Sequence, residues 1–263
     1  MKKICICGGG SLGHVIAGYL SANGKATVSI LTNHPTAWQN KIEICVPDNG
    51  EMLIGNIACV SANPAEALLD AEIVLLCLPG FLIKDELIKI RDFINSGTYV
   101  GSVFSSTGFF FEALKLLNED IPLWGFQRVP FISRIKEYGH SASLLGYKGC
   151  YHIAVERDTD ANKELFRYWV ENSFDRPVTL LKNYLEASLT NSNPLLHTAR
   201  LYSMFHDWQP GISYPRNILF YEEWTEDAAK LLIQMDAEFF TLLGVLPVTS
   251  GYSCLIQFLI YFS

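Results

Sequence analysis

Three glycines near the N-terminus have the spacing of a nucleotide-binding turn. Gly8, Gly10 and Gly13 form G-x-G-x-x-G between an apolar run that predicts a strand at 2–7 and an amphipathic run that predicts a helix at 12–23. In this pattern the first glycine permits a tight turn, the second leaves room for a pyrophosphate, and the third lets helix and strand pack closely. The helix N-terminus then favours the phosphate charge. The pattern predicts a dinucleotide site, and a glycine-rich turn without a ligand is the alternative.

The end of the second expected strand, at 26–32, bears on the choice between NAD and NADP. NAD-selective sites usually carry Asp or Glu about 20 residues after the glycines, where the carboxylate accepts hydrogen bonds from the ribose. This chain instead has Thr32, Asn33 and His34, whose side chains can donate to a 2′-phosphate without repelling it. No arginine stands there to clamp the phosphate. We therefore expect NADP or NAD as the cofactor, with NADP preferred.

A third strand, expected at 72–78, adds one candidate to the cofactor crevice. It runs into Cys77-Leu78-Pro79, at the carboxyl end of a strand, where dinucleotides bind in open parallel sheets. A buried strand that proline simply terminates explains the same residues equally well. The candidate cofactor-binding residues are Gly8, Gly10, Ser11, Leu12, Gly13, Thr32, Asn33 and Pro79.

A second group of candidate residues lies in the second half of the chain. Asn193 and His197 stand four residues apart in AsnProLeuLeuHis, inside a helical pattern at about 183–206, and so share one helix face. A histidine can transfer the proton that accompanies hydride transfer to a carbonyl or imine, and a nearby amide can orient the substrate. A structural histidine, with Asn193 and Pro194 restarting a helix as cap and first residue, is the alternative.

Short apolar runs alternate with longer amphipathic ones up to about residue 155, which is typical of strand–helix–strand units around a parallel sheet. We expect strands at 2–7, 26–32, 72–78, 98–104, 121–126 and 150–155, with helices at 12–23, 64–70, 81–95 and 109–118. Ile42–Val60 should form short extended pieces joined by turns. Later helical patterns lie at about 160–173, 183–206 and 225–243. The predicted fold class is α/β, with a Rossmann-type doubly wound sheet (1–156) followed by an all-helical domain (157–263).

The composition limits the classes of partner. The chain has 263 residues, of which 49% are hydrophobic, enough for two unequal domains. Its 20 Lys and Arg against 27 Asp and Glu give a net charge of −7, which provides no general basic field for nucleic acid or an anionic membrane. Seven cysteines are expected as reduced thiols, and no apolar run reaches the roughly 20 residues of a membrane helix. We expect a cytoplasmic protein without nucleic-acid, membrane or metal partners.

Five segments, taken in order, resemble the octopine/nopaline (opine) dehydrogenases. They are the glycine pattern, GlyPheGlnArgValProPheIleSerArg at 125–134, GluTyrGly at 137–139, LeuGlyTyrLys at 145–148 and AsnProLeuLeuHis at 193–197. The resemblance runs from residue 2 to about 250. It implies an oxidoreductase that transfers hydride from NAD(P)H to the imine formed by an amino acid and a 2-oxo acid.

The resemblance also implies roles for single residues. His197 becomes the catalytic acid/base, and Asn193 becomes its substrate-orienting neighbour. Arg128 and Glu112 fall where family members contact the oxo acid, and the arginine fork suits a carboxylate. Glu112 fits less well, because a carboxylate repels an acid, and it could instead meet an amine or face solvent. The implied partners are the 2-oxo acid and the amino acid, and a homodimer stays open.

The chain departs from the family at its C-terminus. Family members continue further, and the resemblance implies that their extension supplies an acidic residue bonded to the histidine and part of the amino-acid pocket. This sequence ends at Ser263 after a run at 251–263 that differs from the family. The helical domain is therefore expected to be incomplete. Without the carboxylate the imidazole is poorly oriented, so we expect little turnover from the 263-residue form.

Two other functions stay open. A 2-dehydropantoate 2-reductase has the same two-domain plan, but its catalytic lysine should stand in a helix with asparagines at spacings of four. Lys182 has Glu186 and Thr190 at those spacings. A nucleotide-binding protein without catalytic activity is the other alternative.

Overall fold

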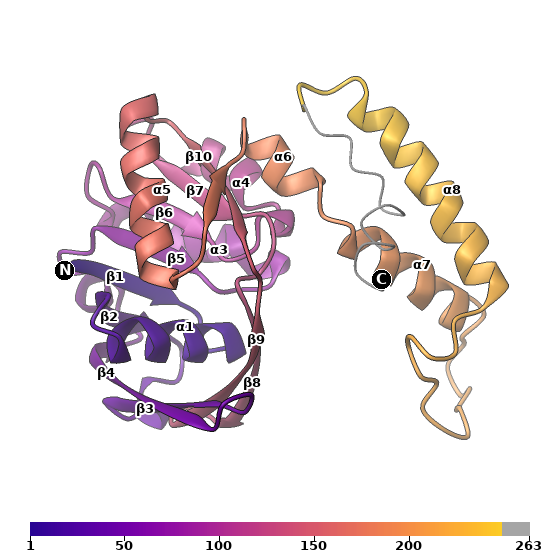
Figure 1. Ribbon diagram of the computed structural model, residues 1–263, viewed down its shortest axis with the longest axis horizontal. Coiled ribbons are helices and arrows are strands. Elements are labelled where there is room, and N and C mark those ends of the chain that lie inside the picture. Colours follow the sequence, from indigo (N-terminus) through magenta and orange to yellow (C-terminus); the bar gives the residue numbers. More distant parts are fainter. Residues whose placement is uncertain (249–263) are drawn as a thin grey trace. The chain divides into compact units, whose positions relative to one another are not determined.

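The computed structural model describes residues 1–248 and divides into two compact units (Figure 1). The first unit is Met1–Ser188, and the second begins at Leu189. The division lies later than the predicted boundary between 156 and 157, because the segment 157–188 packs on the sheet of the first unit. The C-terminal run at 251–263 lies outside the described residues.

An 11-stranded sheet forms the centre of the first unit, in the order β11-β10-β7-β6-β5-β1-β2-β4-β3-β9-β8. The neighbours in β4-β2-β1-β5-β6-β7 are all parallel, which is the strand order of a doubly wound dinucleotide-binding sheet. The predicted α/β fold class is confirmed. The strands are β1 (Lys2–Cys7), β2 (Ala26–Leu31), β3 (Lys41–Val46), β4 (Glu51–Ser61), β5 (Ile73–Leu76), β6 (Tyr99–Ser102), β7 (Leu123–Phe126), β8 (Phe131–Glu137), β9 (Ser141–Tyr147), β10 (Tyr151–Glu156) and β11 (Val178–Leu180).

Helices cover both faces of this sheet, and each face has its own apolar core. One core takes Ile16 and Leu20 from α1 and Phe166 from α5. The other takes Leu87 from α3 and Phe109 from α4. Because both faces are covered, central strands such as β5 are buried along their whole length. The helices are α1 (Ser11–Ala22), α2 (Pro64–Ala67), α3 (Gly80–Ile90), α4 (Phe109–Leu116), α5 (Asp160–Phe174) and α6 (Tyr184–Leu189), with 3-10 turns at Pro35–Ala37, Arg91–Phe93 and Ser105–Thr107.

The sheet continues past β4 into an edge that contacts α1. The hairpin of β3 and β4 corresponds to the extended pieces expected at 42–60, and β9 then pairs in parallel with β3 through Ile44 and Ala142. Helix α1 contacts β3, β4, β8 and β9 (Figure 1). The sequence pattern does not predict β8 and β9, because exposed residues such as Arg134 and Glu137 interrupt the apolar run of β8.

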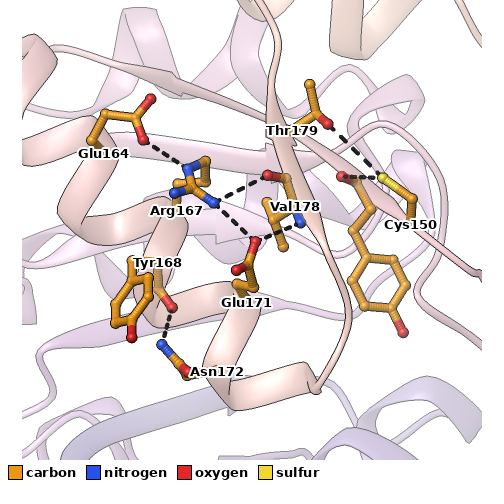
Figure 2. Close-up of polar contacts among 9 residues, drawn as sticks. Cys150, Glu164, Arg167, Tyr168, Glu171, Asn172, Val178 and Thr179 are labelled. Carbon is orange, nitrogen blue, oxygen red and sulfur yellow. Dashed lines mark hydrogen bonds and ion pairs between the residues drawn. The ribbon is translucent and has the colours of Figure 1, made fainter.

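A charged network fastens α5 to the edge strand β11 (Figure 2). The guanidinium of Arg167 donates to Glu164 at 2.7 Å, to Glu171 at 2.9 Å and to the carbonyl of Val178 at 3.3 Å. Glu171 also accepts the backbone N–H of Val178 at 3.0 Å. Both polar backbone groups of Val178 are thereby bonded by one helix face. The network joins two elements of the segment after residue 156, and the parallel pairing of β11 with β10 joins that segment to the sheet of the first unit.

The second unit contains the helices α7 (Asn193–Phe205) and α8 (Glu226–Leu243), packed around Leu196, Ala199 and Leu232. Thr225 caps α8, since its side chain accepts the N–H of Ala228. The long helix predicted at 183–206 is divided into α6 and α7. Among residues 1–248, no helix is both long and apolar enough to cross a bilayer.

Candidate dinucleotide and catalytic sites

The three glycines of the N-terminal pattern have different surroundings. Gly8 has a φ of +117°, and a Cβ on it would lie 2.7 Å from the carbonyl oxygen of Cys77. A Cβ on Gly13 would lie 2.2 Å from the carbonyl oxygen of Gly8. A Cβ on Gly10 would meet no heavy atom within 4 Å. The fold itself therefore requires glycine at 8 and 13, whereas at 10 it leaves open space in front of the helix.

That open space lies at the N-terminus of α1. Gly10 is the N-cap residue and offers no capping side chain, and the first turn, which begins with Ser11 and Leu12, carries no acidic residue. The positive end of the helix dipole is thus left without a negative side chain of its own. An anion such as a pyrophosphate suits this arrangement. The residues fit the phosphate part of a dinucleotide.

A pocket with a volume of about 460 Å³, open solvent at its mouth included, lies beside the glycine turn. It opens at the carboxyl ends of β1, β2 and β5, where the strand order reverses and where open sheets bind ligands. Three of the predicted cofactor residues line the pocket: Gly8, Thr32 and Asn33. Pro79 is also predicted, but the pocket is lined by its neighbour Leu78 instead. Its lining residues are Gly8, Gly9, Leu31, Thr32, Asn33, His34, Leu78, Glu86, Lys89 and Tyr138.

Three of these lining residues, Glu86, Lys89 and Tyr138, are not predicted from the sequence as cofactor-binding residues. Glu86 and Lys89 come from α3, with Lys89 Nζ 3.8 Å from a Glu86 carboxylate oxygen. Burial raises the pKa of the Glu86 carboxyl, and the charge of Lys89 opposes that shift. Tyr138 comes from the turn between β8 and β9, which the sequence pattern does not predict. Only the GluTyrGly motif at 137–139 could have drawn attention to it.

His14 connects the glycine turn to the β8–β9 turn. Its Nε2 accepts the backbone N–H of Gly139 at 2.7 Å, and its Nδ1 lies 2.9 Å from the carbonyl oxygen of Gly10. Because an N–H can only donate, Nε2 must be the unprotonated nitrogen, and Nδ1–H donates to Gly10. The ring also packs against Trp38, with 4.1 Å between the centroids and 32° between the ring planes. Burial lowers the pKa of His14, in keeping with a neutral imidazole.

Two basic residues, Lys148 and His152, lie near Arg128, the candidate carboxylate-binding residue. Arg128 follows β7, Lys148 follows β9, and His152 lies in β10. The backbone carbonyl of His152 accepts the N–H of Gln127, the residue before Arg128. Burial lowers the pKa values of Lys148 and His152, and the charge of Arg128 lowers both further. Arg128 and Lys148 therefore produce a positive potential that an anionic substrate can neutralise, beside a His152 whose lowered pKa favours the neutral imidazole.

Glu112, the other candidate substrate residue, stands in the first turn of α4. Its carboxylate lies 3.7 Å from Nζ of Lys115, one helical turn later. The side chain is about one-third exposed. These contacts are those of a helix-surface ion pair.

The candidate catalytic pair is held in the second unit. Asn193 is the first residue of α7 and His197 stands one turn later, both exposed, so the predicted common helix is present. The hydroxyl of Tyr221 lies 3.5 Å from Nε2 of His197, and the ring of Phe220 meets the imidazole edge to face at 5.2 Å. Partial burial lowers the pKa of His197.

Arg200 anchors the segment that carries these two aromatic residues. Its side chain is only 1% exposed, and it donates to the carbonyl oxygens of Phe220 and Leu219 at 2.9 and 3.1 Å. Arg200 lies on α7 three residues after His197. One helix thus positions both the imidazole and the loop that faces it.

The constellation expected of a 2-dehydropantoate reductase is not formed. Lys182 is exposed and precedes α6, whereas Thr190 follows that helix. Glu186 is 3% exposed and accepts the backbone N–H of Lys182. Within the described part of the chain, no three His, Cys, Asp or Glu side chains are grouped so as to hold a metal ion.

Residues 180–262 match the family described as NAD/NADP octopine/nopaline dehydrogenase, alpha-helical domain. In this segment the chain is similar to the helical domain of the octopine/nopaline dehydrogenases. A 253-residue similarity at 28% identity links it to an uncharacterized protein of Sinorhizobium fredii (strain NBRC 101917 / NGR234), over 90% of this chain and 65% of that protein. A tauropine dehydrogenase of Arabella iricolor is 26% identical over 90% of this chain and 64% of its own length. The chain thus spans about two-thirds of the length of these relatives.

Solved structures agree with this family in fold. An octopine dehydrogenase in complex with NADH and agmatine superposes with a TM-score of 0.81 at 19% identity, over 99% of this chain and 70% of that one. A ketopantoate reductase from Ralstonia eutropha JMP134 superposes with a TM-score of 0.56 at 17% identity, over 75% of this chain and 61% of that one. The octopine/nopaline family fold therefore accounts for more of the chain.

Proposed function

We propose that this chain supplies the dinucleotide-binding and catalytic residues of an opine dehydrogenase. The reaction would reduce the imine formed between the amine of an amino acid and a 2-oxo acid. The proposal depends on two features that occur in one chain. An open glycine turn lies at the switch point of a doubly wound sheet. His197 lies on α7, inside the segment that matches the octopine/nopaline helical domain. NADH in the related octopine dehydrogenase structure supports the same cofactor class.

The cofactor would be held by its phosphates and its ribose. Gly10, Ser11 and Leu12 offer backbone amides at the positive end of α1, and Thr32 and Asn33 face the ribose position. Gly8 and Gly13 keep the turn close to the sheet. Pro79 follows Leu78, whose side chain lines the pocket. When bound, the nicotinamide supplies the hydride that reduces the imine.

The other roles belong to side chains of this chain. Arg128, near Lys148 and His152, would bind the carboxylate of the oxo acid through two parallel hydrogen bonds. Asn193 would orient the reacting carbon, and His197 would give a proton to the nitrogen as reduction proceeds and take it back in the reverse direction. Glu112, paired with Lys115, would face solvent or an amine rather than the oxo acid.

An absorbance assay of NAD(P)H oxidation tests the proposal. In a form of the protein as long as its relatives, we expect oxidation with pyruvate plus members of an amino-acid panel, and little with pyruvate alone or ketopantoate alone. Oxidation with ketopantoate alone would instead support the reductase alternative, which is favoured only by the fold likeness. Tight dinucleotide binding with no oxidation in any mixture would support a binding protein without catalysis.

The preference for NADP is a further part of the proposal. No acidic residue stands at the end of β2, and the cation of Lys89 lines the pocket beside Thr32 and His34. A carboxylate at position 32 would repel a 2′-phosphate, so Thr32→Asp should shift the ratio of NADPH to NADH affinity towards NADH. Calorimetric titration with both dinucleotides measures the ratio. Wild-type protein that binds NADH much more tightly than NADPH would contradict the preference.

A further inference from the structure

The turn between β8 and β9 brings a phenol to the dinucleotide pocket. Tyr138 Oη lies 3.3 Å from Thr32 Oγ1 at the end of β2, and both residues line the pocket. A Cβ on Gly9 would lie 2.4 Å from the same phenol oxygen and 3.1 Å from Thr32 Oγ1. The two hydroxyls therefore stand together between the glycine turn and the ribose end of β2. No other element of the described chain offers a phenol there.

The turn that carries Tyr138 is fixed on several sides. Gly139 donates its N–H to His14 Nε2 at 2.7 Å, and its carbonyl oxygen accepts the N–H of Gln39 at 3.0 Å. The carbonyl oxygen of His140 accepts the N–H of Glu43 at 2.9 Å. Gly139 has a φ of +75°, and a Cβ on it would lie 2.0 Å from a backbone oxygen of Ala37. Tyr138 is thus presented by a backbone that has little freedom to move, which favours preorganised binding.

The hydroxyl pair has one hydrogen left to offer. Each hydroxyl carries one O–H, and the Thr32–Tyr138 bond uses only one of them, whichever oxygen donates. Thr32 Oγ1 also accepts the backbone N–H of His34 at 3.3 Å, which consumes an acceptor site and no hydrogen. When Thr32 donates to Tyr138, the remaining O–H is that of Tyr138, and it can point to a ligand oxygen in the pocket. The end of β2 is where doubly wound sheets bind the adenosine ribose.

We propose that Tyr138 is a cofactor-binding residue whose hydroxyl, paired with Thr32, donates a hydrogen bond to the oxygen at the 2′ position of the adenosine ribose, and that His14 positions it. The acceptor is the 2′-hydroxyl in NADH and a 2′-phosphate oxygen in NADPH. This inference rests on the proposed function, because it needs a dinucleotide in the pocket. It adds a residue from β8–β9 to a site otherwise built from β1, β2, β5 and the helices that follow them.

The first test removes one oxygen atom. Tyr138→Phe keeps the ring, and we expect NADPH and NADH to bind roughly three- to tenfold more weakly, as the loss of one hydrogen bond implies. The loss should be larger for NADPH, since charge-assisted bonds are stronger. Tyr147→Phe makes the same change at the other end of the hairpin, on a side chain that is 51% exposed, and should bind both dinucleotides as wild type does. Isothermal calorimetry gives the affinities, and thermal unfolding confirms that both variants fold.

The second test addresses the positioning role of His14. His14→Gln retains an acceptor for the Gly139 N–H, so we expect it to bind dinucleotide nearly as wild type does, whereas His14→Leu should lose affinity as Tyr138→Phe does. In the folded His14→Leu background, adding Tyr138→Phe should cost little more, because the phenol is already misplaced. A His14→Gln variant that binds as poorly as His14→Leu would overturn the positioning role.

The outcomes separate this inference from the proposed function. Wild-type protein that binds neither dinucleotide would overturn both. Wild-type protein that binds dinucleotide, together with an unchanged Tyr138→Phe affinity, would overturn the Tyr138 assignment and leave the proposed function standing. Equal losses in Tyr138→Phe and Tyr147→Phe would also overturn it, because the effect would then belong to the hairpin as a whole.

Discussion

Gly10 and Gly13 stand three residues apart in the same pattern but should respond differently to the same substitution. Gly10→Val adds a side chain to open space with an ordinary φ of −80°, so the fold should stay stable while dinucleotide affinity falls about tenfold or more. Gly13→Val forces atoms against the Gly8 carbonyl and should lower the free energy of unfolding by about 1 to 3 kcal/mol. Calorimetry and urea unfolding on both variants check this. Unchanged dinucleotide affinity in Gly10→Val would reject the phosphate assignment.

The buried His14 should make stability depend on pH. Its pKa is lowered in the fold from the ordinary 6.5, so below that pH the unfolded state binds more protons than the native state. The contribution of neutral His14 to the free energy of unfolding is complete above about pH 6.5. It is lost as the pH falls towards the lower pKa of His14 in the native state. We expect His14→Gln, which does not titrate, to lose part of this decline in urea unfolding between about pH 8 and pH 5. An identical decline in the variant would show that His14 is not responsible.

The sequence predicts the role of a single residue where that role depends only on the local backbone. The glycine spacing predicts the turn, because G-x-G-x-x-G needs only a strand before it and a helix after it. Tyr138 and His14 could not be assigned in this way. Their roles depend on a hydrogen bond between Gly139 and His14, which are 125 residues apart in the chain.

At the scale of elements, α7 is the one that carries the candidate chemistry. His197→Ala should lower turnover by about 10² to 10⁴ and leave dinucleotide affinity intact, because the helix presents the imidazole without supporting the nucleotide pocket. Thr198→Ala is the matched control, since Thr198 is also exposed but lies on another side of α7. Turnover unaffected by His197→Ala would exclude the residue as acid/base. The comparison needs a form of the protein with measurable turnover.

The helices and strands of the structure show where apolar periodicity predicts secondary structure correctly. The central strands and most helices follow directly from apolar periodicity, because they are buried on the faces that the pattern predicts. The predicted helix at 183–206 is instead two helices, since Pro194 opens α7 and the side chain of Asn191 accepts the N–H of Asn193. Local hydrogen bonds at residues 190–192 outweigh the continuous apolar pattern.

The whole chain should separate at the division between Ser188 and Leu189. A fragment of residues 1–188 should fold cooperatively and bind dinucleotide, because it contains the entire sheet, both of its cores and the pocket. A fragment of residues 1–156 lacks α5 and β11, so Trp124 and Phe126 lose the rings of Phe166 and Phe174 that pack against them, and the fragment should aggregate or unfold. Circular dichroism and calorimetry compare the two. A stable, nucleotide-binding 1–156 fragment would support the boundary after residue 156 that is predicted from composition.

The hairpin of β8 and β9 also bears on how the protein is made. During synthesis the glycine turn leaves the ribosome early, whereas the strand that pairs with β3, and the turn that pins His14, leave it much later. A nascent chain that ends before β9 already contains the G-x-G-x-x-G turn, but the β8–β9 turn that carries Tyr138 cannot yet line the pocket. Nucleotide should therefore begin to protect the growing chain from protease only after residue 147 has emerged, and until then the exposed edge of β3 is open to pairing with other chains.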